Sequence, residues 1–487
     1  MFGTRPEKTK ARFAHSIPDE AALLTADAEQ VSSLEAVDLP ETSECGLWPR
    51  LRGSALIRYF GRSQFFRNMS VVLGGTVVAQ AVGVAIAPVI SRLFTPSDFG
   101  VLGSFNSILL VVAAFATLQY SQALMLPRNE EDAANVFGAS LLSVCIVTLV
   151  ALLVAYLRSD WLLGLLKAPQ SAWLLWFLPL GIFVAGINRS FQAWCVRRKA
   201  FTTTASSQIL GAGSSNMLKI VFGILNQGSP GLIVSSVAAN GIASMSLARR
   251  VLCADKALLK ESLNWRRIAS QARVYRDFPV YSATQNTMNA VSQGLPVLML
   301  AHFHGIAVAG AYAFGMKLIH VPMDFILTAL RQVLFQKASE THNQGGGLLQ
   351  LFIKTTGGLM AVALLPSIVV FIWAPELFSW GFGEDWWEAG MFARWLTLWM
   401  YAGFCNVPAN LFARILRQQR NLFLYECIVL FSRTIILLVG GLYWSALSTV
   451  AVFSALGFLL NSALILWIGS LLLQQRKPVE ASGIRQR

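Results

Sequence analysis

Charged residues are scarce in this chain of 487 residues, making up 13% of it, whereas an ordinary soluble domain carries about 25%. Histidine occurs five times, and neither an H-E-x-x-H metal pattern nor a G-x-x-x-x-G-K-[ST] phosphate-binding loop is present. None of the six cysteines falls on the side of the membrane predicted below to be oxidising. These shortages argue against a soluble enzyme with one large core, a metal or nucleotide cofactor, and a disulfide framework. No cofactor is expected.

What the chain has instead is long apolar runs. Hydrophobic residues make up 55% of it and the mean hydropathy is +0.55. Because a helix of about 20 residues crosses ~30 Å of hydrocarbon, each run is long enough to span a bilayer. The sequence therefore predicts an all-α integral membrane protein with about twelve transmembrane helices. The segments are 69–92, 101–126, 135–157, 172–195, 203–226, 231–252, 279–301, 308–332, 352–373, 389–413, 421–443 and 446–473.

The basic residues predict the orientation. The net charge is +14, and 31 of the 39 Lys and Arg residues fall in alternate connections and the two ends, against 3 in the other connections. Cytoplasmic loops of membrane proteins carry this excess, so both termini are expected in the cytoplasm and the chain in the cytoplasmic membrane. Since the cations are spread among short loops rather than gathered on one face, the lipid bilayer and no nucleic acid is the expected partner.

The longest inner connection, 254–277, is basic and divides the spans six and six. It predicts two six-helix lobes, 68–253 and 278–473, around a central cavity, a recurring plan among transporters. Residues 1–67 are polar and predicted to be a disordered cytoplasmic tail, and 474–487 a second, short one. The longest outer loop carries Trp380, Trp386 and Trp387, expected in an aromatic belt at the lipid headgroups.

A polar stripe follows the seventh apolar segment. Ser282, Asn286, Asn289 and Gln293 recur at spacings of four, three and four residues, which places them on one helix face. Such groups serve either as hydrogen-bonding contacts between helices or as the wall of a polar cavity. Four on one face favour the cavity wall, and amides and hydroxyls suit a hydroxyl-rich ligand such as a sugar.

The eighth segment carries a second stripe, Lys317, His320 and Asp324, at spacings of three and four. Two interpretations remain open. Lys317 and Asp324 form an internal pair that neutralises itself, or Lys317 contacts an anion beside a titratable pair. Asp324 is the one acid deep inside a predicted span, so Asp324, with His320, is the candidate for ion coupling.

Cations outnumber acids inside the predicted spans. They are Arg189, Lys219, Lys317, Arg394 and Arg433. Arg394 lies near an outer end, where it can reach the interface. Self-neutralising pairs would give equal numbers of cations and acids, so the excess points to an anionic ligand. Arg and Lys both suit phosphate, which makes Arg189, Lys219, Lys317 and Arg433 the candidate substrate-binding cations.

Four stretches in order along the spans resemble one known family. They are Ser91-Arg-Leu-Phe-Thr-Pro-Ser-Asp-Phe-Gly100, Leu126-Pro-Arg-Asn-Glu-Glu-Asp-Ala-Ala-Asn135, Asp277-Phe-Pro through Leu295-Pro296, and Phe382-Gly-Glu-Asp-Trp-Trp-Glu-Ala-Gly390. Over residues 68–473 the chain resembles the polysaccharide and oligosaccharide flippases, of the O-antigen and exopolysaccharide type, in the multidrug/oligosaccharidyl-lipid/polysaccharide exporter superfamily.

The resemblance implies a central cationic cavity that opens to each side in turn without ATP. The implied substrate is a polyprenyl-diphosphate-linked sugar or oligosaccharide for surface polysaccharide, and the implied partners are a polysaccharide polymerase and export machinery. No catalytic residue is implied. Two alternatives stay open: a multidrug or ion antiporter of the same superfamily, whose cavity should be acidic, and a membrane-embedded polysaccharide polymerase or ligase, which should carry basic residues in a sizeable outer loop.

Overall fold

A computed structural model describes residues 64–159, 174–343, 347–416 and 418–483. Every regular element among these residues is a helix, which confirms the prediction of an all-α protein. The first set of helices is α3 (Gln64–Leu93), α4 (Pro96–Ala116), α5 (Tyr120–Ala123), α6 (Glu130–Leu157), α8 (Leu174–Arg197), α9 (Phe201–Ile224) and α10 (Gly228–Ser262). The second is α11 (Trp265–Val274), the π-helical turn η1 (Phe278–Ser282), α12 (Ala283–His304), α13 (Ile306–Asn343), α14 (Leu348–Phe382), the 3₁₀ turn η2 (Glu384–Trp386), α15 (Trp387–Cys405), α16 (Val407–Ile415), α17 (Gln419–Tyr443) and α18 (Ala446–Gly483).

Eight of these helices are long and apolar enough to cross a membrane, so the chain is a multi-pass membrane protein. The other four predicted spans fall on α8, α9, α12 and the α15–α16 pair, so the count of twelve crossings stays a prediction. Helix α18 continues to Gly483 and thus into the predicted C-terminal tail. The predicted N-terminal tail lies outside the described residues except for 64–67, which begin α3.

Two predicted spans are interrupted. Helix α4 ends at Ala116, and the next turn holds Leu118 and Gln119 at φ of 46° and 58°, a left-handed conformation that residues with a Cβ seldom adopt. The Gln119 side chain stabilises this turn, because its Nε2 donates to the Ala114 carbonyl over 2.9 Å. A second break, at Asn406, separates α15 from α16. Irregular backbone at membrane depth is tolerated where it is buried in protein or lines a cavity.

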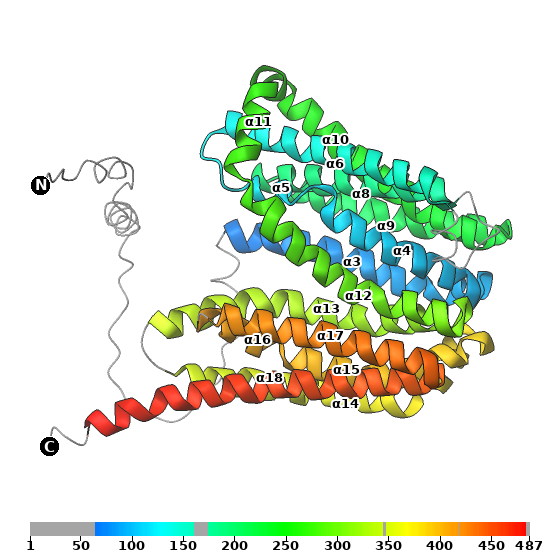
Figure 1. Cartoon of the computed structure of the whole chain (residues 1–487), viewed down its shortest axis with the longest axis vertical. Helices are drawn as coiled ribbons and strands as arrows, with labels where there is room; N and C mark the ends of the chain where they lie inside the picture. Colours follow the sequence, from blue (N-terminus) through cyan, green and yellow to red (C-terminus); the bar gives the residue numbers. More distant parts are fainter. Residues whose placement is uncertain (1–63, 160–173, 344–346, 417, 484–487) are drawn as a thin grey trace, which may run out of the picture. The chain divides into compact units, whose positions relative to one another are not determined.

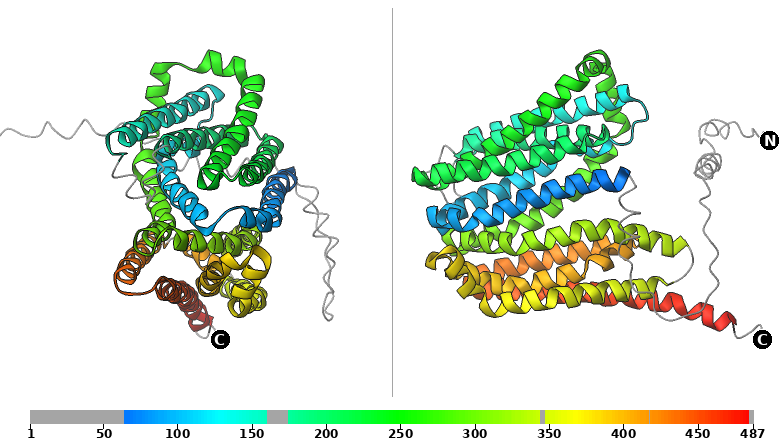
Figure 2. Two further views of the ribbon diagram at one scale, coloured as in Figure 1. Left: turned by 90° about the vertical axis from the view of Figure 1, so that its right-hand side faces the viewer. Right: turned by 180° about the vertical axis from the view of Figure 1, so that it is seen from behind.

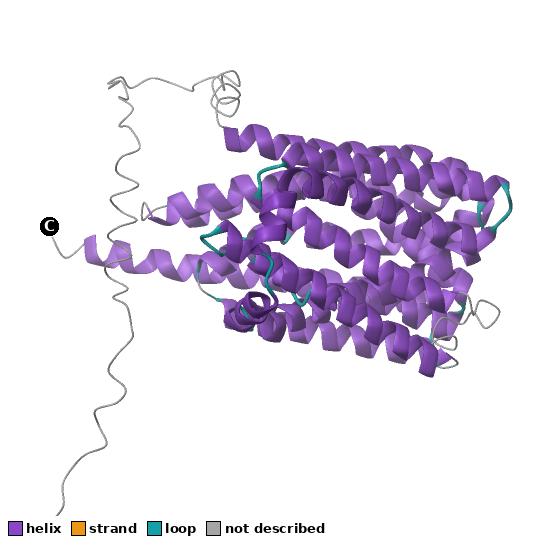
Figure 3. Ribbon diagram, turned by 90° about the horizontal axis from the view of Figure 1, so that it is seen from above, coloured by secondary structure: helices purple, strands orange, loops and turns teal. Residues whose placement is uncertain are grey.

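The helices associate in two groups (Figures 1 and 2). Helices α6, α8, α9 and α10 pack with one another, and α14 to α18 form the other group. Helix α4 lies against α12 and α13 and so joins the groups. The loops that connect the helices lie at the two ends of the bundle, as Figure 3 shows. The predicted linker 254–277 is largely helical, comprising the end of α10 and α11. The exact lobe boundaries stay a prediction.

At one end of the helices, the beginnings of α4 and α13 are in backbone contact. A Cβ on Gly100 would collide with the Ile306 carbonyl, and one on Gly310 with the Pro96 carbonyl. Glycine is required here because the two helices approach more closely than any side chain allows. We call this region the closed end.

Trp386 reinforces the closed end instead of lying in a headgroup belt as expected. Its side chain is buried, and its indole N–H donates to the Ser91 carbonyl over 2.9 Å. Its ring packs against Phe99 and Phe314, with centroids 5.1 and 4.1 Å away. The belt prediction was therefore wrong for Trp386, whereas for Trp380 and Trp387, which are exposed, it stays a prediction. The closed end thus joins two of the stretches quoted above, 91–100 and 382–390.

Candidate functional site

A cavity of about 780 Å³ lies between α4, α12, α13, α15 and α17; we call it the cationic cavity. Its lining contains the predicted stripe of α13, two residues of the predicted polar stripe of α12, and two further cations. The predicted residues that it brings together are Lys317, His320, Asp324, Arg433, Asn289 and Gln293, and Arg331 joins them. Lysine and arginine side chains therefore outnumber acids in this lining by three to one.

Arg433 is held in this cavity by aromatic rings. Its guanidinium carbon lies 4.4 Å from the ring centre of Trp399 on α15 and 5.5 Å from that of Phe453 on α18. Such stacking stabilises a cation without neutralising it. The Arg433 Nε atom is buried and has no hydrogen-bond partner among the described residues. The side chain is therefore fixed in place while part of its donor capacity remains unused.

The stripe on α13 bears on the two open interpretations of Lys317 and Asp324. Asp324 is bonded to His320, with 2.8 Å between Oδ2 and Nδ1, and the ion pairs of the described residues do not join Asp324 to Lys317. Lys317 is instead exposed to the cavity. Among the described residues Lys317 thus forms no ion pair with Asp324, which favours the interpretation in which Lys317 contacts an anion.

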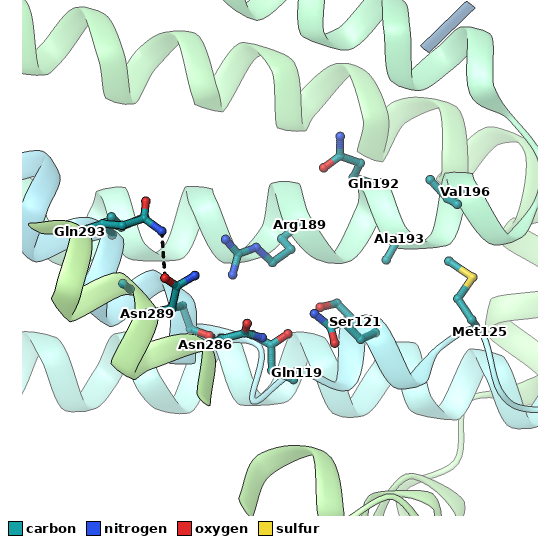
Figure 4. A pocket seen from close by; sticks show the side chains of 14 residues that line it. Gln119, Ser121, Met125, Arg189, Gln192, Ala193, Val196, Asn286, Asn289 and Gln293 are labelled. Atoms are coloured by element: carbon teal, nitrogen blue, oxygen red, sulfur yellow. Dashed lines mark hydrogen bonds between the residues drawn. The ribbon is translucent and has the colours of Figure 1, made fainter. Parts of the chain in front are cut away.

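A second cavity, of about 410 Å³, adjoins the first and shares Asn289 and Gln293 with it. We call it the amide cavity. Figure 4 shows Arg189 of α8 pointing toward the amides of α12, with Asn286 and Gln119 beside it. Gln293 donates to Asn289 over 3.3 Å, while one Arg189 nitrogen donates to the Ala113 carbonyl over 3.2 Å. In the amide cavity, therefore, the Arg189 guanidinium faces the side-chain amides of α12.

Two predicted site residues lie outside these linings. Ser282 ends the turn η1 and lines neither cavity, and Lys219 on α9 does not line them either. Lys219 therefore stays a candidate from the sequence alone. Arg394, left out of the candidate site, donates to the Ile372 carbonyl over 2.9 Å and is absent from both linings.

Several lining residues were missed from the sequence. Gln119 and Ser121 reach the amide cavity because the helix breaks before them, and no glycine or proline marks that break. Gln192 could have been found, since it follows Arg189 by three residues and so shares its helix face. Within the described residues, no group of three or more His, Cys, Asp or Glu side chains could hold a metal ion.

Comparison with known proteins places the chain among proteins of polysaccharide biosynthesis. The family model described as "Polysaccharide biosynthesis protein" matches residues 89–390. The succinoglycan biosynthesis transport protein ExoT of Rhizobium meliloti (strain 1021) is 22% identical over 296 residues, 59% of this chain and 56% of that one. The match thus spans little more than half of that relative. A membrane protein encoded in the cps region of Klebsiella pneumoniae, described as uncharacterized, is 20% identical over 77% of this chain and 75% of its own.

Solved structures with the same fold are transporters. The inward-facing conformation of a multidrug resistance MATE family transporter of the MOP superfamily superposes with a TM-score of 0.60 at 14% identity, over 82% of this chain and 96% of that one. A mutant of the MATE transporter VcmN of Vibrio cholerae gives 0.51 at 16% identity, over 86% of this chain and 98% of that one. At these identities the likeness shows the fold alone.

Proposed function

We propose that this chain, which belongs to the polysaccharide biosynthesis protein family and has the fold of MOP superfamily transporters, flips polyprenyl-diphosphate-linked sugars or oligosaccharides across the cytoplasmic membrane. It acts in surface polysaccharide biosynthesis, by alternating access and without ATP hydrolysis. Both termini lie in the cytoplasm, and a polysaccharide polymerase takes the product on the outer side. The chain is a transporter rather than an enzyme.

One observation carries this proposal: unpaired cations and a wall of amides share one set of adjoining cavities. Lys317 and Arg433 line the part next to Asn289 and Gln293, and Arg189 lies on the far side of those amides. None of these cations takes part in an ion pair within the described residues. A diphosphate supplies the missing negative charge, and sugar hydroxyls match the amides.

The closed end suits the alternating-access mechanism. Its contacts are apolar packing, backbone approaches at Gly100 and Gly310, and the hydrogen bond from Trp386, and breaking these would expose no buried charge. We propose that this end opens to release the glycan outside. The His320–Asp324 pair, which borders the cationic cavity, is the proposed site at which a proton is coupled to that change.

The cavity charge bears on the antiporter alternative. A site for drug cations should be acidic, whereas the cationic cavity has Lys317, Arg331 and Arg433 against Asp324. The balance therefore favours an anionic substrate.

Deletion of the gene tests the proposal against the enzyme alternative. We expect lipid-diphosphate-linked glycan to accumulate on the inner leaflet, with loss of the surface polymer. Accumulation of unpolymerised units on the outer leaflet would mean that flipping is intact and that the chain acts as a polymerase or ligase.

A further inference from the structure

A third cavity, of about 260 Å³, lies among α3, α8, α9 and α10 and has no ionisable residue in its lining. We call it the neutral cavity. Its polar lining consists of amides and hydroxyls from all four helices, namely Thr76, Gln80, Asn188, Gln192, Ser207, Gln208 and Asn240. It borders the amide cavity through Gln192, which lines both. The three cavities therefore follow one another as neighbours, cationic, amide and neutral.

The geometry points to this neutral cavity as a subsite for the glycan, with the diphosphate held at the cationic cavity. This inference rests on the proposed function and adds the direction in which the substrate lies. Helix α8 supports it, because Asn188 faces the neutral cavity, Arg189 faces the amide cavity, and Gln192 one turn further lies between them.

The side chains that line the neutral cavity suit a sugar better than a coupling ion. A coupling proton needs a titratable group, and the lining has none. A cation site in a membrane protein generally contains a carboxylate, which is also absent from it. The Gln80 Oε1 atom is buried without a hydrogen-bond partner among the described residues, so an acceptor is left for an incoming hydroxyl. Gln208 is positioned by Thr76, with 2.7 Å between Oε1 and Oγ1.

Binding of soluble short-chain analogues to the purified full chain in lipid nanodiscs tests the inference. The probes are farnesyl diphosphate and farnesyl diphosphate carrying glucose, galactose or N-acetylglucosamine. We expect at least one glycosylated probe to bind about tenfold more tightly than farnesyl diphosphate, the gain from one or two added hydrogen bonds. The double variant Asn188→Leu, Asn240→Leu should abolish that preference and leave the affinity for farnesyl diphosphate unchanged.

The controls separate the subsite from the proposed function. Asn421→Leu removes an amide on α17 that lies outside the neutral cavity, and it should keep the preference. Lys317→Gln should weaken all four probes to the same extent. Equal affinity of the wild-type chain for all four, or a preference that survives in the double variant, would overturn the sugar subsite alone. No binding of any probe would overturn the proposed function together with it.

Discussion

The closed end and the cationic cavity differ in the residues that form them: glycine and a buried tryptophan at the closed end, and lysine and arginine in the cavity. At the closed end Gly100 and Gly310 remove even a Cβ to let backbones meet, and Trp386 is buried with its indole N–H bonded. In the cavity Lys317 is exposed and, among the residues that the structure describes, forms no ion pair. Arg433 is fixed by rings, and its Nε atom has no hydrogen-bond partner in the same part of the chain. A charge inside a membrane protein is costly, so a cation that lines a cavity is a candidate for binding a ligand. The comparison separates residues that hold the fold together from residues that we propose to bind the substrate.

The largest effect is expected from the cavity cations. Lys317→Ala and Arg433→Ala should each lower export of lipid-linked glycan about tenfold or more, because each removes a cation proposed to contact the diphosphate in the cavity. Arg394→Ala is the matched control, a cation on α15 outside both cavities, and should leave export near the wild-type rate. Export is measured at equal membrane abundance. Wild-type export by Lys317→Ala would remove Lys317 from the substrate site.

The glycines of the closed end give the next largest effect, on stability. Gly310→Ala should lower the free energy of unfolding by about 1–3 kcal/mol, because its methyl group collides with the Pro96 carbonyl. Gly213→Ala on α9 meets nothing within 4 Å and should not destabilise the protein. Thermal unfolding of both variants in detergent checks this. Equal melting temperatures would mean that the helices do not meet at Gly310.

The His320–Asp324 pair should change the pH dependence of transport with little change in abundance. An asparagine side chain resembles the protonated carboxyl and cannot titrate. Asp324→Asn should therefore flatten the dependence of the transport rate on pH. Rates in proteoliposomes at several pH values measure this. A profile identical to the wild type would leave the pair a structural contact.

The smallest effect is expected at the closed-end tryptophan. Trp386→Phe keeps an aromatic ring but loses the hydrogen bond to Ser91, at a cost of about 1 kcal/mol. Trp380→Phe changes a side chain that is 84% exposed and should cost nothing measurable. Thermal unfolding again compares the two. If the two variants have the same melting temperature, the Trp386 hydrogen bond contributes no stability.

The helices were predictable because hydropathy reports burial in lipid directly. The predicted segment 421–443, for example, agrees within two residues with α17. The break after Ala116 was not predictable, since Leu118 and Gln119 are not residues that favour a left-handed backbone. The burial of Trp386 was missed for a different reason. It depends on Ser91 and Phe99, almost three hundred positions away in the sequence.

Residue spacing predicted which side chains of the candidate site share a face of the same helix, but not how the helices are arranged around a cavity. The spacing of Asn286, Asn289 and Gln293 predicted a shared face, and the structure places all three on cavity linings. Which helices meet across a cavity has no signature in periodicity. The neutral cavity draws one or a few polar side chains from each of four helices, so no single stripe revealed it.

Transbilayer movement in liposomes that contain only the purified chain tests the central claim most directly. A polyprenyl-diphosphate-linked oligosaccharide, placed in one leaflet and read by a lectin or glycosidase confined to the other side, reports each crossing. The account predicts movement with the wild-type chain and its loss with Lys317→Ala. No movement above protein-free liposomes by the folded wild-type chain, under an imposed proton gradient of either direction, would contradict it.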